Sequence, residues 1–281
     1  MRQEVDFIKF NPTQNMTLLV KTKHLTEQYS RIASRLMSYD SVHAEQVGFI
    51  EQAQQDGARA HLQMAGGEFC GNACMALAAW LAWENGLGPN ERTEVRLGVS
   101  GAEGLVNCRV NRLADEYYCQ LDMPVPQRLE QRTISYEGSE WNLAMVRYPD
   151  FLHVVIEAEV ICEDLRKRAE SLAKLLGSVS EWSMVGILLY QPVRNELAPL
   201  IYVPELDSLV WERGCGSGTA SVGAYLAWKQ QKDTSVEIRQ PGGTIHVDAT
   251  WRGQEVVRLQ IGGSVGIVAQ GKAYIEIGSN N

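Results

Sequence analysis

The pattern of hydrophobic positions predicts the same order of elements twice along the chain. In the first half, strand-like apolar segments at 5–10, 16–20, 47–50 and 95–97 accompany a helical stripe at Tyr29, Ile32, Ala33, Leu36 and Met37. In the second half, segments at 141–147, 154–156, 185–188 and 236–238 accompany a stripe at Leu165, Ala169, Leu172 and Leu176, which we expect to end at a C-cap, Gly177. Such a repeat predicts two copies of one α/β unit.

The spacing of corresponding segments supports a duplication. The offset is 138 residues from Asn15 to His153, and a proline pair at 124 and 126 lies near the junction of the two copies. We therefore expect an N-terminal half at 1–125 and a C-terminal half at 126–265. A lone alternating strand at 273–277, within the last segment 266–281, is expected to return to the sheet of the first half.

Each copy also contains a cysteine in a glycine turn directly before a helical run. Cys70 and Cys215 are each followed, 13 residues later, by a tryptophan, Trp83 and Trp228. The first of these runs, at 73–83, is apolar on every side, which is typical of a helix enclosed by other elements. We therefore expect an α/β (α+β) fold with two pseudo-symmetric domains, each a curved mixed sheet wrapped around a central helix.

Composition narrows the class of protein. The chain has 281 residues, 45% hydrophobic content and a net charge of −8, so it can bury a sizeable core and has no basic footprint for nucleic acid. Its start lacks a signal-peptide pattern, and its longest apolar run, 75–83, is too short to span a membrane. We expect a cytoplasmic protein with a small-molecule partner and neither nucleic acid nor membrane; a homodimer is left open. Its six cysteines form no CxxC pairs, which favours reduced thiols over disulfides or zinc.

The duplicated cysteine turn predicts acid–base chemistry. The positive end of a helix stabilises an anion, so a thiol there is expected to have a pKa lowered from about 8.5 toward neutrality. Two such thiols can remove a proton from one face of a carbon acid and return one to the other face. Backbone N–H groups of Gly71, Asn72, Gly216 and Ser217 would hold a carboxylate and its enolate-like charge. This arrangement predicts a racemase of α-amino acids that needs no cofactor and no metal.

The motifs that carry this chemistry also resemble a known family. FCGNA and GCGSGTA, in this order on a duplicated scaffold, resemble the cysteine motifs of diaminopimelate epimerase and its relatives, which include proline racemase. A more extensive resemblance, through FNPTQNMTLLV, EQVGFIE, PLIYVPELDSLVWE, QPGGTI and GKAYIE, is to the histidine racemases of staphylopine-type (opine) metallophore synthesis. The resemblance implies that Cys70 and Cys215 are the acid/base pair between the two domains. It also implies that Asn15, Gly71, Asn72, Gly216 and Ser217 hold the head of the amino acid.

The sequence departs from diaminopimelate epimerases where those enzymes grip a second amino-acid head. Aromatic or apolar residues stand there, namely Tyr148, Phe151, Trp182 and Met184. Such a pocket favours a flat side chain with a polar edge, and Glu45 or His153 could meet the nitrogen of an imidazole. The resemblance to the histidine racemases then implies histidine as the substrate, with diaminopimelate, proline or hydroxyproline as alternatives. A cysteine hydrolase with one essential cysteine and a non-catalytic binding protein remain as remote alternatives.

Overall fold

A computed structural model describes residues 2–136, 138–179 and 182–276 of the chain. It divides into two compact units: Met1–Asp122 together with Gly262–Asn281 form unit 1, and Met123–Ile261 form unit 2. The fold is mixed α+β, with many strands and few helices, as the sequence predicted.

Unit 1 is built on strands β1 to β7, which neighbour one another in chain order. The β2/β3 and β4/β5 pairs are parallel, while β1/β2, β3/β4, β5/β6 and β6/β7 are antiparallel. The elements are β1 (Arg2–Pro12), β2 (Thr17–Val20), η1 (Thr26–Gln28), α1 (Tyr29–Met37), β3 (Gln46–Glu51), β4 (Ala60–Met64), α2 (Gly71–Glu84), β5 (Arg92–Val99), β6 (Val106–Arg112) and β7 (Tyr117–Met123).

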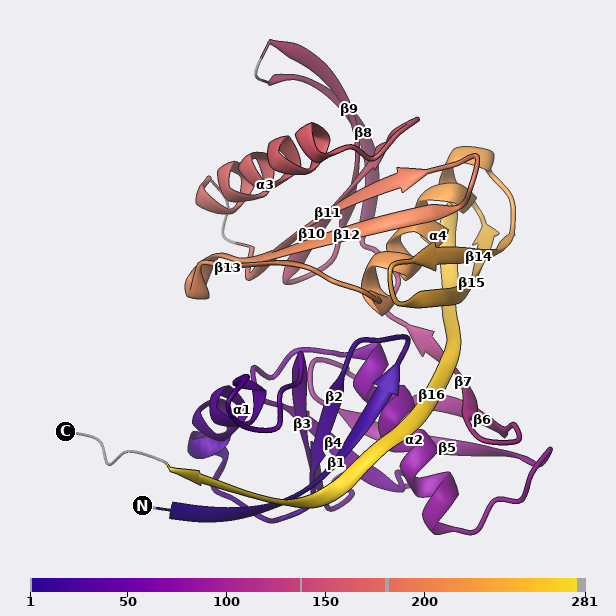
Figure 1. The fold of residues 1–281 in the computed structure, drawn as a ribbon. Coiled ribbons are helices and arrows are strands. Elements are labelled where there is room, and N and C mark those ends of the chain that lie inside the picture. The colour runs from indigo at the N-terminus through magenta and orange to yellow at the C-terminus, as the bar shows by residue number, and fades with distance from the viewer. Residues whose placement is uncertain (1, 137, 180–181, 277–281) are drawn as a thin grey trace. The chain divides into compact units, whose positions relative to one another are not determined.

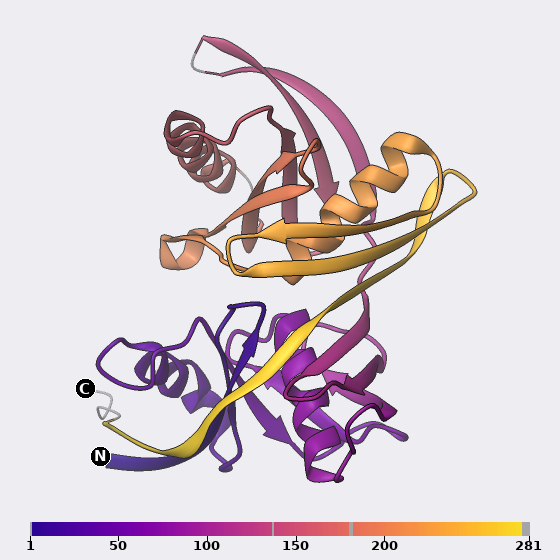
Figure 2. The ribbon, with the colours of Figure 1, turned by 45° about the vertical axis from the view of Figure 1, so that its right-hand side comes forward.

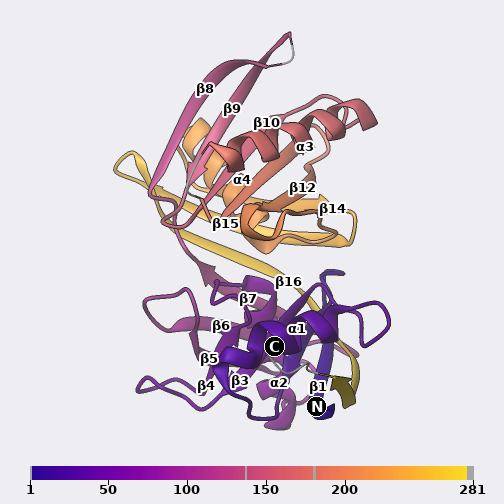
Figure 3. The same ribbon diagram turned by 90° about the vertical axis from the view of Figure 1, so that its left-hand side faces the viewer.

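Unit 2 has the sheet order β15-β14-β12-β11-β10-β9-β8, with β13 beside β12, and the long hairpin β8–β9 at one edge (Figure 3). The β10/β11 pair is parallel. The elements are β8 (Arg128–Tyr136), β9 (Ser139–Arg147), β10 (Phe151–Glu157), α3 (Glu163–Ser178), β11 (Met184–Gln191), β12 (Glu196–Val203), η2 (Pro204–Leu206), β13 (Ser208–Trp211), α4 (Gly216–Gln230), β14 (Thr234–Gln240), β15 (Gly243–Arg252) and β16 (Glu255–Glu276).

Each unit places one helix inside its curved sheet and one outside. In Figures 1 and 2, α1 and α2 lie on opposite sides of the unit 1 strands, and α3 and α4 lie on opposite sides of the unit 2 strands. The helix α2 is buried continuously from Gly71 to Ala82, and α4 is buried from Gly218 to Ala227. Many of these residues are Ala or Gly, whose small side chains let strands approach closely; a Cβ on Gly223 would stand 2.4 Å from Val247 Cγ2. The prediction of a helix wrapped by strands is confirmed.

The final strand differs from the expectation. Residues 273–276 are the end of β16, a strand of 22 residues, rather than a separate strand. Its later part, from Val265 to Glu276, pairs antiparallel with β1 in unit 1. Ile277, the last residue of the expected strand, lies outside the described residues.

Gly177 is not a C-cap. It lies inside α3, whose C-cap is Val179, and is buried against β12 and η2. A Cβ on Gly177 would stand 2.7 Å from the Tyr202 ring and 3.0 Å from Pro204. The glycine is therefore needed for close helix–sheet packing, a tertiary requirement that a sequence pattern does not distinguish from a helix end.

The expected correspondence of Asn15 with His153 is wrong in the register of the strands. Gly48 of β3 and Gly186 of β11 keep the offset of 138, but Gly48 pairs with Leu19 and Gly186 pairs with His153. His153 therefore takes the place of Leu19 in the repeat. The slip arises in the connection between the paired strands, which holds a helix of 9 residues in unit 1 and of 16 residues in unit 2.

Candidate active site

The first half of the candidate site is the N-terminus of α2 in unit 1. Cys70 is the N-cap, with extended backbone, and its Sγ accepts a hydrogen bond from the N–H of Ala73 at 3.4 Å. The thiol also donates to Oε1 of Gln46 at the start of β3. Cys70 is nearly buried, at 9% exposure, so little bulk water reaches its sulfur. The sulfur's neighbours are the first turn of α2 and the Gln46 amide.

The second half is the N-terminus of α4 in unit 2. Cys215 is again the N-cap, and its Sγ accepts from the N–H of Gly218 at 3.2 Å, with Ser217 Oγ at 3.5 Å. A Cβ on Gly218 would stand 3.0 Å from this sulfur, so glycine keeps the N–H close to it. Each unit therefore presents one cysteine whose sulfur meets the first turn of a buried helix, as the repeat predicted.

The expected lowering of the thiol pKa is wrong for Cys215. Burial, and after it the carboxylate of Glu212, raise the pKa of the Cys215 thiol well above its ordinary value. The Gly218 N–H and the Ser217 hydroxyl act in the opposite direction but are outweighed, because at 3% exposure a thiolate lacks most of the hydration that would stabilise its charge in water. Cys215 is therefore a thiol, a proton donor, in the ligand-free protein near neutral pH.

The predicted binding residues of unit 1 occupy two adjoining segments. Gly71 and Asn72 form the first turn of α2 beside Cys70, and both are buried. Asn15 is buried in the turn between β1 and β2, where its N–H donates to the Pro12 carbonyl.

Glu45, by contrast, is exposed directly before β3. Its carboxylate accepts a hydrogen bond from the N–H of Met16 at 2.5 Å, and its own N–H donates to the Met16 carbonyl. The carboxylate thus ties the start of β2 to the start of β3 in this structure, next to Asn15.

The predicted binding residues of unit 2 are divided. Gly216 is buried and Ser217 is half-buried, both in the first turn of α4 beside Cys215. His153 on β10 is fully buried, and its Nδ1 lies 2.8 Å from Oγ of Ser221 on α4, which also contacts the Tyr148 hydroxyl at 2.9 Å. Burial lowers the pKa of His153 to about 3, so the imidazole is neutral. In this structure His153 joins the sheet to α4, the helix that Cys215 caps.

The aromatic residues expected around a substrate side chain lie in two places. Tyr148 and Phe151 stack on each other, with ring centroids 4.2 Å apart, and Met184 pairs with Phe151 in the sheet. Trp182 packs instead against the core cluster beneath α3. The first group is therefore next to His153, and Trp182 belongs to the α3 side of the sheet.

Sequence reasoning missed two glutamines that hold the cysteine turns. Gln46, adjacent to Glu45, accepts from the Cys70 thiol, and Gln240 accepts from the backbone N–H of Cys215 at 2.7 Å. Gln240 also donates to Thr219 Oγ1, which in turn donates to the Cys215 carbonyl at 2.7 Å. The only available signal was that each glutamine stands within a segment already noted, EQVGFIE and QPGGTI.

Across 2–136, 138–179 and 182–276, no group of three or more His, Cys, Asp or Glu side chains is arranged to hold a metal ion. Within the same ranges, none of the helices has the length and apolar character needed to cross a membrane. None of the six cysteines, all of which lie in these ranges, forms a disulfide.

Solved structures define the class to which this fold belongs. A hydroxyproline epimerase from Agrobacterium vitis, crystallised with trans-4-hydroxy-L-proline, superimposes with a TM-score of 0.72 at 14% identity, covering 98% of this chain and 94% of that one. The fold is thus that of the racemases and epimerases that resemble proline racemase.

Sequence comparison identifies the family within that class. The family model described as histidine racemase CntK N-terminal domain matches residues 4–274, and the chain belongs to this family. A histidine racemase of Staphylococcus aureus strain Mu50 is 38% identical over 278 residues, covering 98% of this chain and 99% of the relative. A histidine racemase of Fusobacterium nucleatum subsp. nucleatum is 30% identical over 276 residues, covering 97% and 98%. The protein is an amino-acid racemase, an isomerase.

Proposed function

We propose that this enzyme interconverts L- and D-histidine, with Cys70 and Cys215 as its two acid/base groups. The observation that supports the mechanism is the matched pair of helix N-caps, in which each sulfur accepts an N–H from the first turn of a buried helix. A racemase must deliver and remove protons on both faces of Cα, and two positioned thiols supply one group for each face.

The reaction starts with Cys215 protonated, because burial and Glu212 raise the pKa of its thiol. The Cys70 thiol, which donates to Gln46 in this structure, first loses its proton to solvent. The resulting thiolate removes the α-proton, and the electrons of the broken Cα–H bond pass into the carboxylate to form an enolate-like intermediate. Cys215 then gives its proton to the opposite face of Cα, which inverts the stereocentre. Afterwards Cys215 holds the thiolate and Cys70 the proton, so the reverse direction uses the pair with their roles exchanged.

The helix ends supply the electrostatic stabilisation that this intermediate needs. The first-turn N–H groups of Gly71, Asn72, Gly216 and Ser217 carry the positive ends of two helix dipoles. We propose that these groups, with Asn15, hold the substrate carboxylate and amino group. The acidity of Cα–H is then raised by fixed backbone dipoles and exclusion of water, without a cofactor or a metal.

Histidine as substrate rests on the family and on the side-chain environment. Two relatives that match nearly the whole chain are histidine racemases. A flat imidazole suits the aromatic group of Tyr148 and Phe151, and the Glu45 carboxylate could exchange its bond to Met16 N–H for one to an imidazole N–H. His153 is proposed to support this pocket through Ser221. Supply of D-histidine for an opine metallophore of the staphylopine type is the proposed biological role.

The direct test of the proposed substrate is NMR in heavy water with histidine, diaminopimelate, proline and 4-hydroxyproline. Loss of the Cα–H signal together with appearance of the opposite isomer is expected fastest for histidine. Faster exchange with any of the other three would refute histidine as substrate and leave the two-thiol mechanism standing. Incorporation of solvent deuterium with no second isomer would refute racemisation itself.

We also propose a cytoplasmic enzyme that acts on a free small molecule and binds neither nucleic acid nor membrane, and we leave a homodimer open. The net charge of −8 supports the absence of a nucleic-acid partner. Cell fractionation with antibody detection tests the location, and light scattering of the purified protein fixes the number of subunits. Recovery in the membrane fraction after a salt wash would overturn the proposed location.

A further inference from the structure

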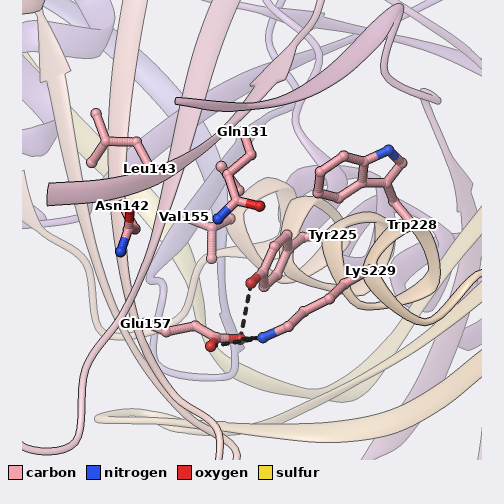
Figure 4. Close-up of a pocket in the computed structure, with 9 residues that line it drawn as sticks. Gln131, Asn142, Leu143, Val155, Glu157, Tyr225, Trp228 and Lys229 are labelled. Carbon is pink, nitrogen blue, oxygen red and sulfur yellow. Dashed lines mark hydrogen bonds and ion pairs between the residues drawn. The ribbon is translucent and has the colours of Figure 1, made fainter. Parts of the chain in front are cut away.

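Unit 2 contains a cavity that the proposed reaction does not use. Its volume is about 320 Å³, within the range of small-molecule sites, and it lies between the sheet and the last turns of α4 (Figure 4). It is lined by Gln131, Asn142, Leu143, Ala144, Val155, Glu157, Tyr225, Trp228 and Lys229. Cys215 and Tyr225 are ten residues apart on α4, about 15 Å of helix, so this cavity is distinct from the Cys215 turn.

The charged groups of the cavity are one carboxylate and one ammonium. Glu157 accepts from Lys229 Nζ through both oxygens, at 2.7 and 2.8 Å, and from the Tyr225 hydroxyl at 2.9 Å (Figure 4). The Lys229 and Glu157 side chains are 49% and 33% exposed. An ion pair this open to solvent stabilises the fold little, so exchanging its partners for those of a ligand costs little.

In unit 1, an ammonium group lies beside the aromatic ring that corresponds to Tyr225. Trp80 follows Cys70 by ten residues, as Tyr225 follows Cys215, and the ammonium of Lys21 lies 5.4 Å from the centroid of the Trp80 ring. Lys21 comes directly after Val20, which pairs with Phe49.

In unit 2 the residue that corresponds to Lys21 has a shorter side chain. Val154 pairs with Ile187, 138 residues after Phe49, and the residue directly after Val154 is Val155. No lysine side chain therefore extends from this strand over Tyr225; Lys229, from the helix itself, lies 5.5 Å from the ring centroid instead. In unit 1, the side chain of Lys21 occupies the space beside the Trp80 ring. In unit 2, the corresponding space beside the Tyr225 ring and the Glu157 carboxylate is a cavity.

We propose that this cavity is a second binding site for a free α-amino acid. The ligand's α-ammonium takes the place of Lys229 at Glu157 and beside the Tyr225 ring, and the released Lys229 ammonium pairs with the ligand's α-carboxylate. Each positive group in the cavity is still paired with a negative group after this exchange. The ligand's side chain then lies toward Trp228 and the carboxamide of Gln131, which is among the residues drawn around the cavity in Figure 4.

The test is ¹⁹F NMR of the full chain labelled with 5-fluorotryptophan, with the Trp228 and Trp83 signals assigned by Trp228→Phe and Trp83→Phe. The probes are glycine, L-histidine and imidazole. We expect the Trp228 signal to shift saturably with glycine and L-histidine but not with imidazole, which has no α-ammonium and α-carboxylate. The same shift is expected in the Cys70→Ser/Cys215→Ser protein, and the Trp83 signal should not follow it.

Variants of the ion pair decide the assignment. Glu157→Gln and Lys229→Met should each weaken binding at Trp228 about tenfold or more, because each removes one charge-assisted contact. The matched control is Glu84→Gln, which should leave the affinity unchanged. Glu84 lies on α2 and follows Cys70 by as many residues as Lys229 follows Cys215. A Trp228 signal that moves with no probe, moves equally with imidazole, or keeps its affinity in both ion-pair variants would overturn the site. Because glycine has no stereocentre to invert, its binding is read independently of whether the enzyme racemises histidine.

Discussion

Ser221 Oγ lies 2.8 Å from His153 Nδ1, so one hydroxyl of the helix α4 bonds to a fully buried imidazole of β10. The same oxygen contacts the Tyr148 hydroxyl at 2.9 Å. Because His153 Nε2 has no hydrogen-bond partner among the described residues and is buried, protonation of the ring would place an uncompensated charge in the core.

Acid should therefore destabilise the fold through His153. The pKa of His153 is lowered from 6.5 to about 3, so between these values the unfolded chain binds a proton that the folded chain does not. The stabilisation is fully present well above pH 6.5 and is lost as the pH falls toward 3. The loss amounts to about 2 kcal/mol at pH 5. Urea unfolding at pH 7.5 and pH 5 measures it. His153→Asn should show a smaller difference between the two pH values, and an equal difference would contradict the assignment.

Gly186→Ala should destabilise unit 2. A Cβ at this position would stand 2.4 Å from His153 Cδ2, and the imidazole cannot retreat because Ser221 holds its other side. We expect a loss of about 1–3 kcal/mol in the free energy of unfolding, as for an overpacked core. Gly104→Ala is the control, because nothing lies within 4 Å of its added Cβ. Equal stability of the two variants in denaturant titrations would show that the sheet relaxes around the added methyl group.

Cys70→Ser and Cys215→Ser should each reduce racemisation by at least about a hundredfold in both directions, because a hydroxyl is too weak an acid and base near pH 7. The rate is followed by chiral chromatography from each pure isomer. Cys162→Ser is the control, since Cys162 is exposed at the start of α3. A Cys70→Ser enzyme with wild-type rates would rule out the two-thiol mechanism.

Glu212→Gln should make Cys215 more reactive. The Glu212 carboxylate is the second cause, after burial, that raises the pKa of this thiol, so a neutral amide lowers it and increases the thiolate fraction at a given pH. Alkylation of Cys215 by iodoacetamide, measured by mass spectrometry in a Cys70→Ser background, should shift to lower pH. Glu205→Gln, on the exposed η2 turn, should leave the profile in place. An unshifted profile for Glu212→Gln would mean that burial alone sets the pKa.

Activity should survive removal of metals and carbonyl cofactors. The proposed acid, base and anion-stabilising groups are all side chains and backbone N–H groups of the chain itself. Dialysis against a chelator, followed by a spectrum to detect any bound aldehyde, should leave the full rate. Recovery of a lost rate on adding zinc or pyridoxal phosphate would refute the proposal. Loss that a thiol reductant reverses is instead the expected result of oxidising the cysteines.

The duplicated cysteine turns were readable from the sequence because their requirements are local. A cysteine at an N-cap needs only the glycine turn and the helical run that follows, and the all-apolar run after Cys70 requires burial wherever it packs. The strands that carry alternating residues were found for the same reason. Gly177 shows the limit, since helix-terminating and close-packing glycines look alike in a sequence and only the Tyr202 ring distinguishes them.

The sequence by itself determined the repeat, the class of fold, the two cysteines and the family, because each depends on the order and spacing of residues along the chain. Tertiary structure alone decided which groups surround them. A connection four residues longer before β11 moved His153 from the expected place of Asn15 to that of Leu19, and there it is buried beneath Ser221. Likewise, packing buried Cys215, and this desolvation, to which the carboxylate of Glu212 three residues earlier adds, outweighs the helix end and keeps the thiol protonated. Desolvation depends on all the atoms around a group, and those neighbours come from distant parts of the chain.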